Sequence, residues 1–262
     1  MWGMRLGWAT VLSGALAVVG LVGMANTVRA DSPVMPELVT GPGFAPFTGE
    51  DLPQGGWMSD LVQRAFKAAG RGYELRFVPW KRGYDGVMSG RFIATFPFAR
   101  TPERERDALF SDPLIQVRQF VYLSTHTRMS FAGPEDFRGR VVCAPLGFGL
   151  PEELEAMIRR GELRRDTPSD LTACVRMVAT GRADAFVLDE YTGSAAIINA
   201  GVINDIRVAE RPYGTLTLHL MVGRMTPDAP AIIARFNDGL KALRDSGVYD
   251  ELLARHTALA PR

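Results

Sequence analysis

Residues 101–113 read TPERERDALFSDP, and this stretch follows a strand-like apolar run over residues 92–96. Pro102 is well tolerated in the first turn of a helix, so Arg104 is expected just beyond a strand-to-helix turn. Its planar guanidinium could hold a carboxylate there through two hydrogen bonds. The alternative is a surface ion pair with one of the neighbouring acids, Glu103, Glu105 or Asp107.

Strand-like and helical segments alternate on both sides of this stretch. Before it, the spacing of apolar residues predicts strands over 39–44 and 73–78 and helices over 58–69 and 84–88. After it, we expect strands over 120–123, 140–144, 185–188 and 216–222, and helices over 151–160, 171–180, 191–199 and 231–244. Alternating strands and helices indicate parallel βαβ units. The pattern restarts once, which predicts an α/β protein of two lobes.

Residues 1–30 are predicted to be a cleaved secretory signal peptide. Arg5 precedes an apolar run, and the small residues Val28 and Ala30 precede a cleavage point before Asp31. The alternative is a membrane anchor, because the run over residues 6–24 approaches spanning length. Cleavage would leave an exported, soluble protein, and the predicted location is the periplasm.

The composition excludes several functional classes. With 30 basic and 29 acidic residues, the formal charge of +1 gives no reason to expect nucleic acid or an anionic membrane as a partner. Two cysteines and three scattered histidines are too few for a cysteine-rich zinc site, and no Ser/His/Asp trio stands out. We therefore expect no metal, no cofactor and no catalytic residues.

Cys143 and Cys174 fall in a predicted strand and a predicted helix of the second lobe. A disulfide is the default interpretation in an exported protein, and in the chain-entropy model it would stabilise the lobe by about 4 kcal/mol. The alternative is two independent buried thiols. A catalytic thiol is not expected, because no histidine lies nearby in the sequence.

Four stretches, taken in order, resemble the type 2 periplasmic solute-binding proteins of bacterial extracellular solute-binding family 3. The most specific is TPER at 101–104 followed by FSDP at 110–113. The other three are GWMSDL at 56–61, Pro79-Trp80 with Gly90, and GRADA at 181–185 with Asp189-Glu190 beyond it. The resemblance covers nearly the whole chain after residue 30.

This resemblance implies a two-lobed clamshell in which each lobe is a mixed, mostly parallel sheet flanked by helices. Lobe 1 would comprise residues 31–116 and 214–262, and lobe 2 residues 117–213. Two strands would form the hinge, near Gln116-Val117 and near Tyr213-Gly214. A small ligand would close the lobes, and the closed monomer would dock transiently on the membrane permease of an ABC importer.

The resemblance also implies that Arg104 binds the α-carboxylate of a ligand and that Asp189 binds its α-ammonium. Asp189 follows the apolar run 185–188, and ligands of open α/β sheets bind beyond such strand ends. The alternative role of Asp189 is to cap the next helix. The two residues come from opposite lobes, so a zwitterion that touches both would favour the closed form.

Further ligand contacts are expected from two loops. In the family, the segment at 96–101 supplies groups to the carboxylate, and the amides at 147–149 would face an anion beside the helix at 151–160, although relatives usually carry Ser or Thr there. Simple packing is the alternative for these segments, and Trp80 and Tyr191 are expected to be structural. The additional ligand-binding candidates are Phe44, Phe96, Phe98, Arg100, Thr101, Gly147, Phe148 and Gly149.

The resulting functional prediction is a non-enzymatic, periplasmic substrate-binding protein of an ABC importer for a small zwitterionic or carboxylate solute, such as an amino acid. One alternative is an accessory or sensor protein on the same fold that binds a cofactor or a partner enzyme. A further alternative is a dehydratase-like enzyme, for which Glu190 is the only spare acid.

Overall fold

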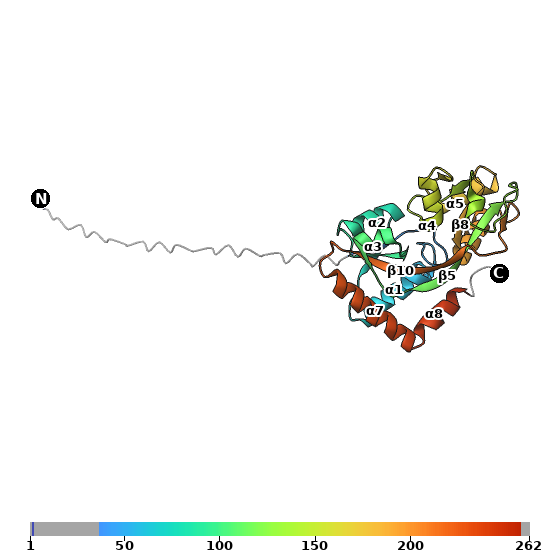
Figure 1. Ribbon diagram of the computed structural model, residues 1–262. Coiled ribbons are helices and arrows are strands. Elements are labelled where there is room, and N and C mark those ends of the chain that lie inside the picture. The colour runs from blue at the N-terminus through green and yellow to red at the C-terminus, as the bar shows by residue number, and fades with distance from the viewer. Residues whose placement is uncertain (1, 3–36, 258–262) are drawn as a thin grey trace. The chain divides into compact units, whose positions relative to one another are not determined.

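The computed structural model describes Trp2 and residues 37–257, and Figure 1 shows its helices and strands. All elements below belong to the unit of residues 35–262. The predicted signal peptide lies outside the described residues. None of the helices described is long and apolar enough to cross a membrane.

Ten strands of the described chain form one mixed sheet. Its order is β2-β1-β3-β10-β5-β8-β6-β7, with β4 paired to β10 and β9 paired to β5. The strands are β1 (Glu37–Thr40), β2 (Glu74–Phe77), β3 (Ala94–Ala99), β4 (Ala108–Phe110), β5 (Ile115–Ser124), β6 (Val141–Cys143), β7 (Arg164–Asp166), β8 (Ala185–Asp189), β9 (Ile206–Val208) and β10 (Gly214–Gly223).

Both ends of the sheet are parallel, as the alternation of strands and helices predicted. Strands β2, β1 and β3 pair in parallel, and so do β8, β6 and β7, whereas the central strands β10 and β5 pair antiparallel with each other and with their outer neighbours. We call β1 to β4 with their helices the β3 side, and β6 to β9 with theirs the β8 side. Strands β5 and β10 join the two sides.

Eight α-helices of the described chain cover the sheet (Figure 1). On the β3 side, α1 packs on α7 and α8, and α2 packs on β1, β3 and β10; on the β8 side, α5 and α6 pack on each other and on β8. The helices are α1 (Trp57–Ala68), α2 (Trp80–Met88), α3 (Pro102–Asp107), α4 (Glu152–Arg159), α5 (Leu171–Ala179), α6 (Glu190–Ala200), α7 (Ala229–Asp245) and α8 (Val248–Thr257).

The contact between α1 and α7 shows how the apolar spacing of a helix becomes packing. The apolar stripe of α1 is buried, and its Phe66 ring lies 5.0 Å from the ring of Phe236 on α7. A glycine permits the close approach, because a β-carbon on Gly239 would lie only 1.9 Å from the carbonyl oxygen of Ala65. The helix predicted over 58–69 is therefore confirmed, one residue earlier at its start.

One residue of strand β5 pairs with a strand on each of its two flanks. Gln119 pairs with Gly214 on β10 and with Asp189 on β8. The hinge positions predicted from the sequence lie within β5 and at the start of β10. Asp189 therefore stands directly beside the strands that join the two sides.

The strand over 92–96 ends later than predicted. Strand β3 runs over Ala94–Ala99, so residues 96–99 belong to the sheet and not to a loop. Pro97 has no N–H to donate, but the pairing of β3 with β10 changes register between His219 and Met221, and prolines are tolerated at such irregularities. The short strands β4, β7 and β9 were not predicted, because three residues are too few to show a periodic pattern.

Candidate functional site

A cleft of about 630 Å³ is lined by residues of both the β3 side and the β8 side. Of the residues predicted to bind ligand, those that line it are Phe44, Phe98, Arg100, Thr101, Arg104, Gly147, Phe148, Gly149 and Asp189. Phe96 does not line it: its side chain is fully buried in the core, because successive residues of a strand point to opposite faces. Its assignment as a ligand contact was wrong.

Arg104 presents a guanidinium that forms no ion pair with the acidic side chains of residues 37–257. It lies on α3, whose cap Thr101 accepts a hydrogen bond from the Arg104 amide at 3.3 Å. Its Nη1 donates to the carbonyl oxygen of Ala99 at 2.9 Å, and its guanidinium lies 5.1 Å from the Phe98 ring centroid. Burial lowers the pKa of Arg104.

The surface ion pair proposed as the alternative for Arg104 does not form. Glu105 pairs instead with Arg100, and none of the carboxylates in the described chain forms an ion pair with Arg104. An unpaired, largely buried cation is costly unless an anion joins it. The site is therefore electrostatically incomplete at this point.

Asp189 is the last residue of β8, and it both caps a helix and lines the cleft. Its Oδ1 accepts hydrogen bonds from the amides of Thr192 at 2.9 Å and Tyr191 at 3.1 Å, so it caps α6. It also lines the cleft, although its side chain is only 2 % exposed. Burial raises its pKa to about 6, against the opposing effect of the helix amides. The helix-cap interpretation is therefore confirmed, and the ligand-binding role stays a prediction.

The start of α4 faces Arg104 across the cleft. Its cap Pro151 offers no side-chain hydrogen bond, and within residues 37–257 the amides of Gly149, Glu152 and Glu153 have no acceptor. A β-carbon on Gly149 would lie 3.4 Å from Nη2 of Arg104. Free amides at a helix start attract anions, so donors from opposite sides of the cleft converge on one position.

Three aromatic rings meet across the cleft, and we call them the aromatic triangle. Phe44 follows β1, Trp80 begins α2, and Phe148 comes from the β8 side. Their ring centroids are 5.8 Å apart for Phe44 and Trp80, 5.9 Å for Phe44 and Phe148, and 5.8 Å for Trp80 and Phe148. Trp80 was expected to be structural, yet it lines the cleft. Tyr191 instead packs on Phe47, outside the cleft lining.

Sequence reasoning missed several residues of the lining. The tyrosine hydroxyl of Tyr213 lies 3.4 Å from Glu153, and Arg165 pairs with Glu155 beneath the loop at 147–149. Arg165 stands in the basic pair Arg164-Arg165, and such pairs are typical of a solvated surface. Gln119 gave no signal in the sequence, because its position opposite Asp189 appears only in the strand pairing.

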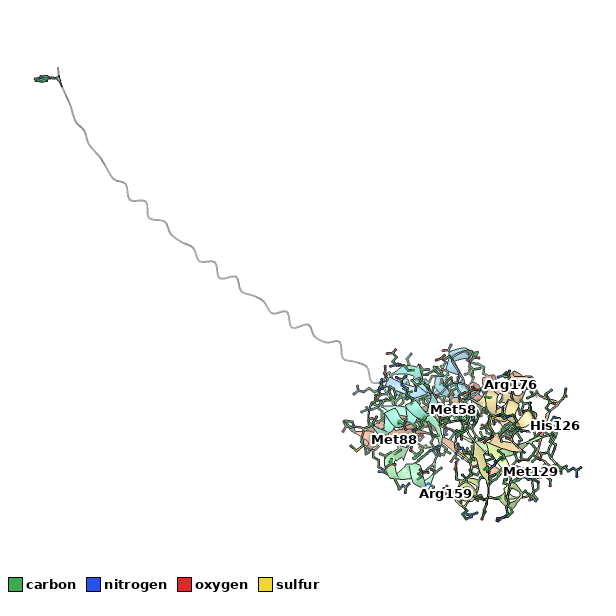
Figure 2. The ribbon with its side chains drawn as sticks, turned by 90° about the horizontal axis from the view of Figure 1, so that it is seen from above. Met58, Met88, His126, Met129, Arg159 and Arg176 are labelled. Atoms are coloured by element: carbon green, nitrogen blue, oxygen red, sulfur yellow. A yellow bond between two sulfur atoms is a disulfide. The ribbon has the colours of Figure 1, made fainter. Side chains whose placement is uncertain are left out.

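The cleft lining contains none of the histidines whose side chains the structure describes. Figure 2 shows His126 and Arg176 on the β8 side, and neither belongs to the cleft. His219 lies buried on β10, with Nδ1 2.8 Å from the Ser111 carbonyl oxygen. Among the described residues, no group of His, Cys, Asp or Glu could hold a metal ion.

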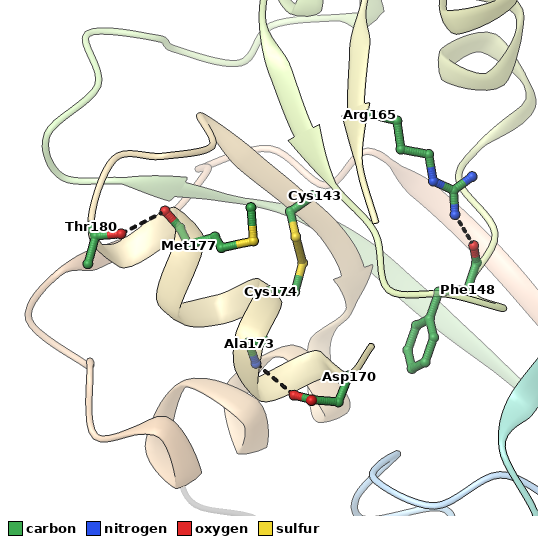
Figure 3. Close-up of a disulfide and its surroundings, with 8 residues drawn as sticks. All are labelled: Cys143, Phe148, Arg165, Asp170, Ala173, Cys174, Met177 and Thr180. Carbon is green, nitrogen blue, oxygen red and sulfur yellow. Dashed lines mark hydrogen bonds between the residues drawn. A yellow bond between two sulfur atoms is a disulfide. The ribbon is translucent and has the colours of Figure 1, made fainter. Parts of the chain in front are cut away.

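Cys143 and Cys174 form a disulfide between β6 and α5, with their Cα atoms 5.7 Å apart (Figure 3). The predicted bridge is therefore present, and the alternative of two free thiols is wrong. Cys143 ends β6, and the chain runs from it into the loop at 147–149. The bridge thus anchors the strand from which this cleft loop departs.

Comparison with known proteins identifies the family. The sequence model of the bacterial extracellular solute-binding proteins, family 3, matches residues 37–258. The chain belongs to this family. It is therefore a solute-binding protein, and the resemblance drawn from its motifs is confirmed. Among curated protein sequences, no match is found.

Solved structures share the fold of this solute-binding protein. An ancestral arginine-binding protein bound to arginine matches with a TM-score of 0.72 at 19% identity, over 84% of this chain and 97% of that one. The arginine-, lysine-, histidine-binding protein ArtJ from Geobacillus stearothermophilus matches with 0.68 at 19%, over 87% and 97%. A histidine kinase sensor domain matches with 0.72 at 22%, over 84% and 95%. At these identities the likeness shows the fold alone, a type 2 periplasmic-binding-protein architecture.

Proposed function

We propose that this solute-binding protein takes a small amino-acid-like zwitterion or carboxylate into the cleft and delivers it to an ABC importer in the periplasm. The observation that carries the proposal is Arg104, a cleft-lining cation without an acidic partner in the described chain. A ligand carboxylate would supply the missing anion.

The carboxylate would be held from both sides of the cleft. Arg104 offers a guanidinium from the β3 side, and the amides of Gly149 and Glu152 at the start of α4 offer donors from the β8 side. Hydrogen bonds of this kind are charge-assisted and strong. A single carboxylate between them would draw the two sides together.

Asp189 would take the ammonium group of the ligand. Its buried carboxyl is costly to ionise without a cation, and a raised pKa of about 6 expresses that cost. An ammonium group beside it would stabilise the charged form. The pair Arg104 and Asp189 therefore selects for a zwitterion over a simple carboxylate.

The remainder of the ligand would meet an apolar wall. Phe98 and the aromatic triangle line this part of the cleft, and two of the nearby acids are occupied, Glu155 by Arg165 and Glu152 by Arg159. An apolar or planar group can pack on such rings. We propose that the two sides are the lobes predicted from the sequence, and that they close by rotation about β5 and β10.

Three experiments test the proposal. Mass spectrometry of small molecules that co-purify with the protein should find an amino-acid-like compound, and calorimetry should show that it binds with one site per chain. Deleting the gene in its native bacterium should abolish uptake of that compound. Normal uptake with loss of a transcriptional response would instead assign the protein to signalling, and absence of binding by any zwitterion or carboxylate would reject the site.

A further inference from the structure

Arg165 and Glu155 hold two consecutive peptide groups of the cleft loop, those that link residues 148–149 and 149–150. The Nη2 atom of Arg165 donates to the carbonyl oxygen of Phe148 at 2.5 Å, as Figure 3 shows. Its Nη1 donates to Oε1 of Glu155 at 3.0 Å, and the same oxygen accepts the amide of Leu150 at 3.1 Å. The two side chains thus fix the carbonyl of one loop residue and the amide of another.

The pair is partly shielded from water and comes from two different elements. Arg165 lies on β7 and Glu155 on α4, with side chains 22% and 27% exposed. The Nε atom of Arg165 is buried without a hydrogen-bond partner. An exposed ion pair contributes little, but hydrogen bonds to charged groups in a shielded position are stronger. Such a pair can therefore fix the shape of a loop.

The loop that the pair holds is one of the places where the β8 side meets the β3 side. Phe148 completes the aromatic triangle with Phe44 and Trp80, and Gly149 faces Arg104. We propose that Arg165 and Glu155 are positioning residues: they hold residues 147–150 in the shape required for cleft closure, and they raise ligand affinity through this loop. This inference rests on the function proposed above.

The role of Arg165 requires a guanidinium, because two of its nitrogens donate to two different acceptors. One arm reaches the Phe148 carbonyl and the other reaches Glu155, and a lysine ammonium cannot place donors at both positions with the same rigidity. Arg165→Lys should therefore release the loop while keeping the charge. Glu155→Ala should release it from the other end, at the Leu150 amide.

The first measurement needs no ligand. Hydrogen exchange of the Leu150 amide should be faster in Arg165→Lys than in wild type, because the Glu155 oxygen that accepts this amide is held by Arg165. The control is Arg160→Gln, which removes a more exposed ion pair with Glu162 from outside the cleft lining. Unchanged Leu150 exchange in Arg165→Lys would overturn the proposal, even if no ligand is ever found.

The second measurement uses the twenty standard L-amino acids as probes, with the tightest binder of the wild type carried into calorimetry. Arg165→Lys and Glu155→Ala should each weaken binding about tenfold, and the double variant should be no weaker than the worse single variant, because residues that act as a unit are not additive. Arg160→Gln should leave affinity unchanged.

Two results of this titration would overturn the inference. If only Arg165→Lys weakens binding and the effects add, Arg165 contacts the ligand itself and does not act through the loop. If both variants lower the free energy of unfolding but keep full affinity, the pair is merely structural. If no amino acid binds the wild type while Leu150 exchange responds as expected, the ligand class fails and the positioning role stands.

Discussion

Gly147 touches Trp80 across the cleft with no room for a methyl group. A β-carbon added to Gly147 would lie 2.7 Å from Cβ of Trp80 and 3.1 Å from the amide nitrogen of Lys81. Gly147 also has a φ of +90°, in the left-handed region that favours glycine. The two sides of the cleft therefore meet at a position where backbone packs directly on a side chain.

Gly147→Ala should consequently weaken ligand binding by preventing full closure. The matched control is Gly139→Ala, since Gly139 has a φ of +72° on the same side of the cleft but nothing within 4 Å of an added β-carbon. Both variants should lose about 1 kcal/mol of unfolding free energy through backbone strain. Calorimetry should find reduced affinity for Gly147→Ala alone; equal affinity in the two variants would refute the closure argument.

Arg104→Ala should weaken binding of a carboxylate ligand by about 2–4 kcal/mol, because a charged group in a shielded site loses its partner. The folded state should not suffer in proportion, since no acidic side chain of the described residues depends on Arg104 for an ion pair. Titration calorimetry and urea unfolding measure the two effects separately. Arg255→Ala on α8, which removes an exposed pair with Glu251, serves as the control. Full affinity in Arg104→Ala would remove this residue from the site.

The affinity for a zwitterion should fall as the pH drops below about 6. Burial raises the pKa of Asp189 to about 6 in the free protein, so protonation at lower pH removes the anion that would receive the ammonium. Asp189→Asn, which can still cap α6, should bind weakly at every pH and show no such slope. Calorimetry between about pH 4.5 and about pH 7.5 (roughly 1.5 units either side of this value) checks both, and a pH-independent affinity in the wild type would contradict the assignment.

The raised pKa of Asp189 also makes the stability of the folded state depend on pH. The folded state binds the Asp189 proton more tightly than the unfolded state, so this residue stabilises the fold at low pH and the contribution is lost as the pH rises from about 4 to about 6. Asp189→Asn should remove that component from the pH dependence of urea unfolding. A wild type and variant with parallel stability curves over this range would show that the carboxyl is not buried as described.

Replacing both Cys143 and Cys174 with Ser should lower the unfolding free energy by up to about 4 kcal/mol, since the bridge constrains a loop of 31 residues in the unfolded chain. Affinity should fall less than stability, because the loop at 147–149 is also held by Arg165. Thiol labelling of the denatured wild type should find no free cysteine. Two labelled thiols per chain would mean that the bridge is absent from the isolated protein.

Much of the fold followed from the sequence because its long elements carry periodic apolar patterns. The helix α1 and the strand β8 were predicted nearly to the residue. Strand β5 was predicted only over its apolar end, since its first half alternates with exposed Gln116 and Arg118 and resembles a surface segment. A strand shared by two sides of a cleft is apolar only where it is covered.

The sequence pointed to residues of the cleft lining where a residue type and a strand end coincide, as for Arg104 and Asp189. Phe96 was misassigned because the extent of β3 was underestimated, and with it which face each residue occupies. Arg165 and Glu155 lie in charged runs without any local pattern, and only the folded chain brings them to the same loop. Contacts between different elements leave no trace in residue spacing, even when the elements are neighbours in the chain as α4 and β7 are.

The shared residue Gln119 has a consequence for how a solute would arrive. Residues on the axis of a rotation move little, and the proposed axis runs along β5 and β10. Gln119 and its paired residues Gly214 and Asp189 would therefore keep the same arrangement in the open and the closed form. The ligand would thus first bind at these preformed residues of the cleft, and the contacts around Phe148 would form only when the two sides close.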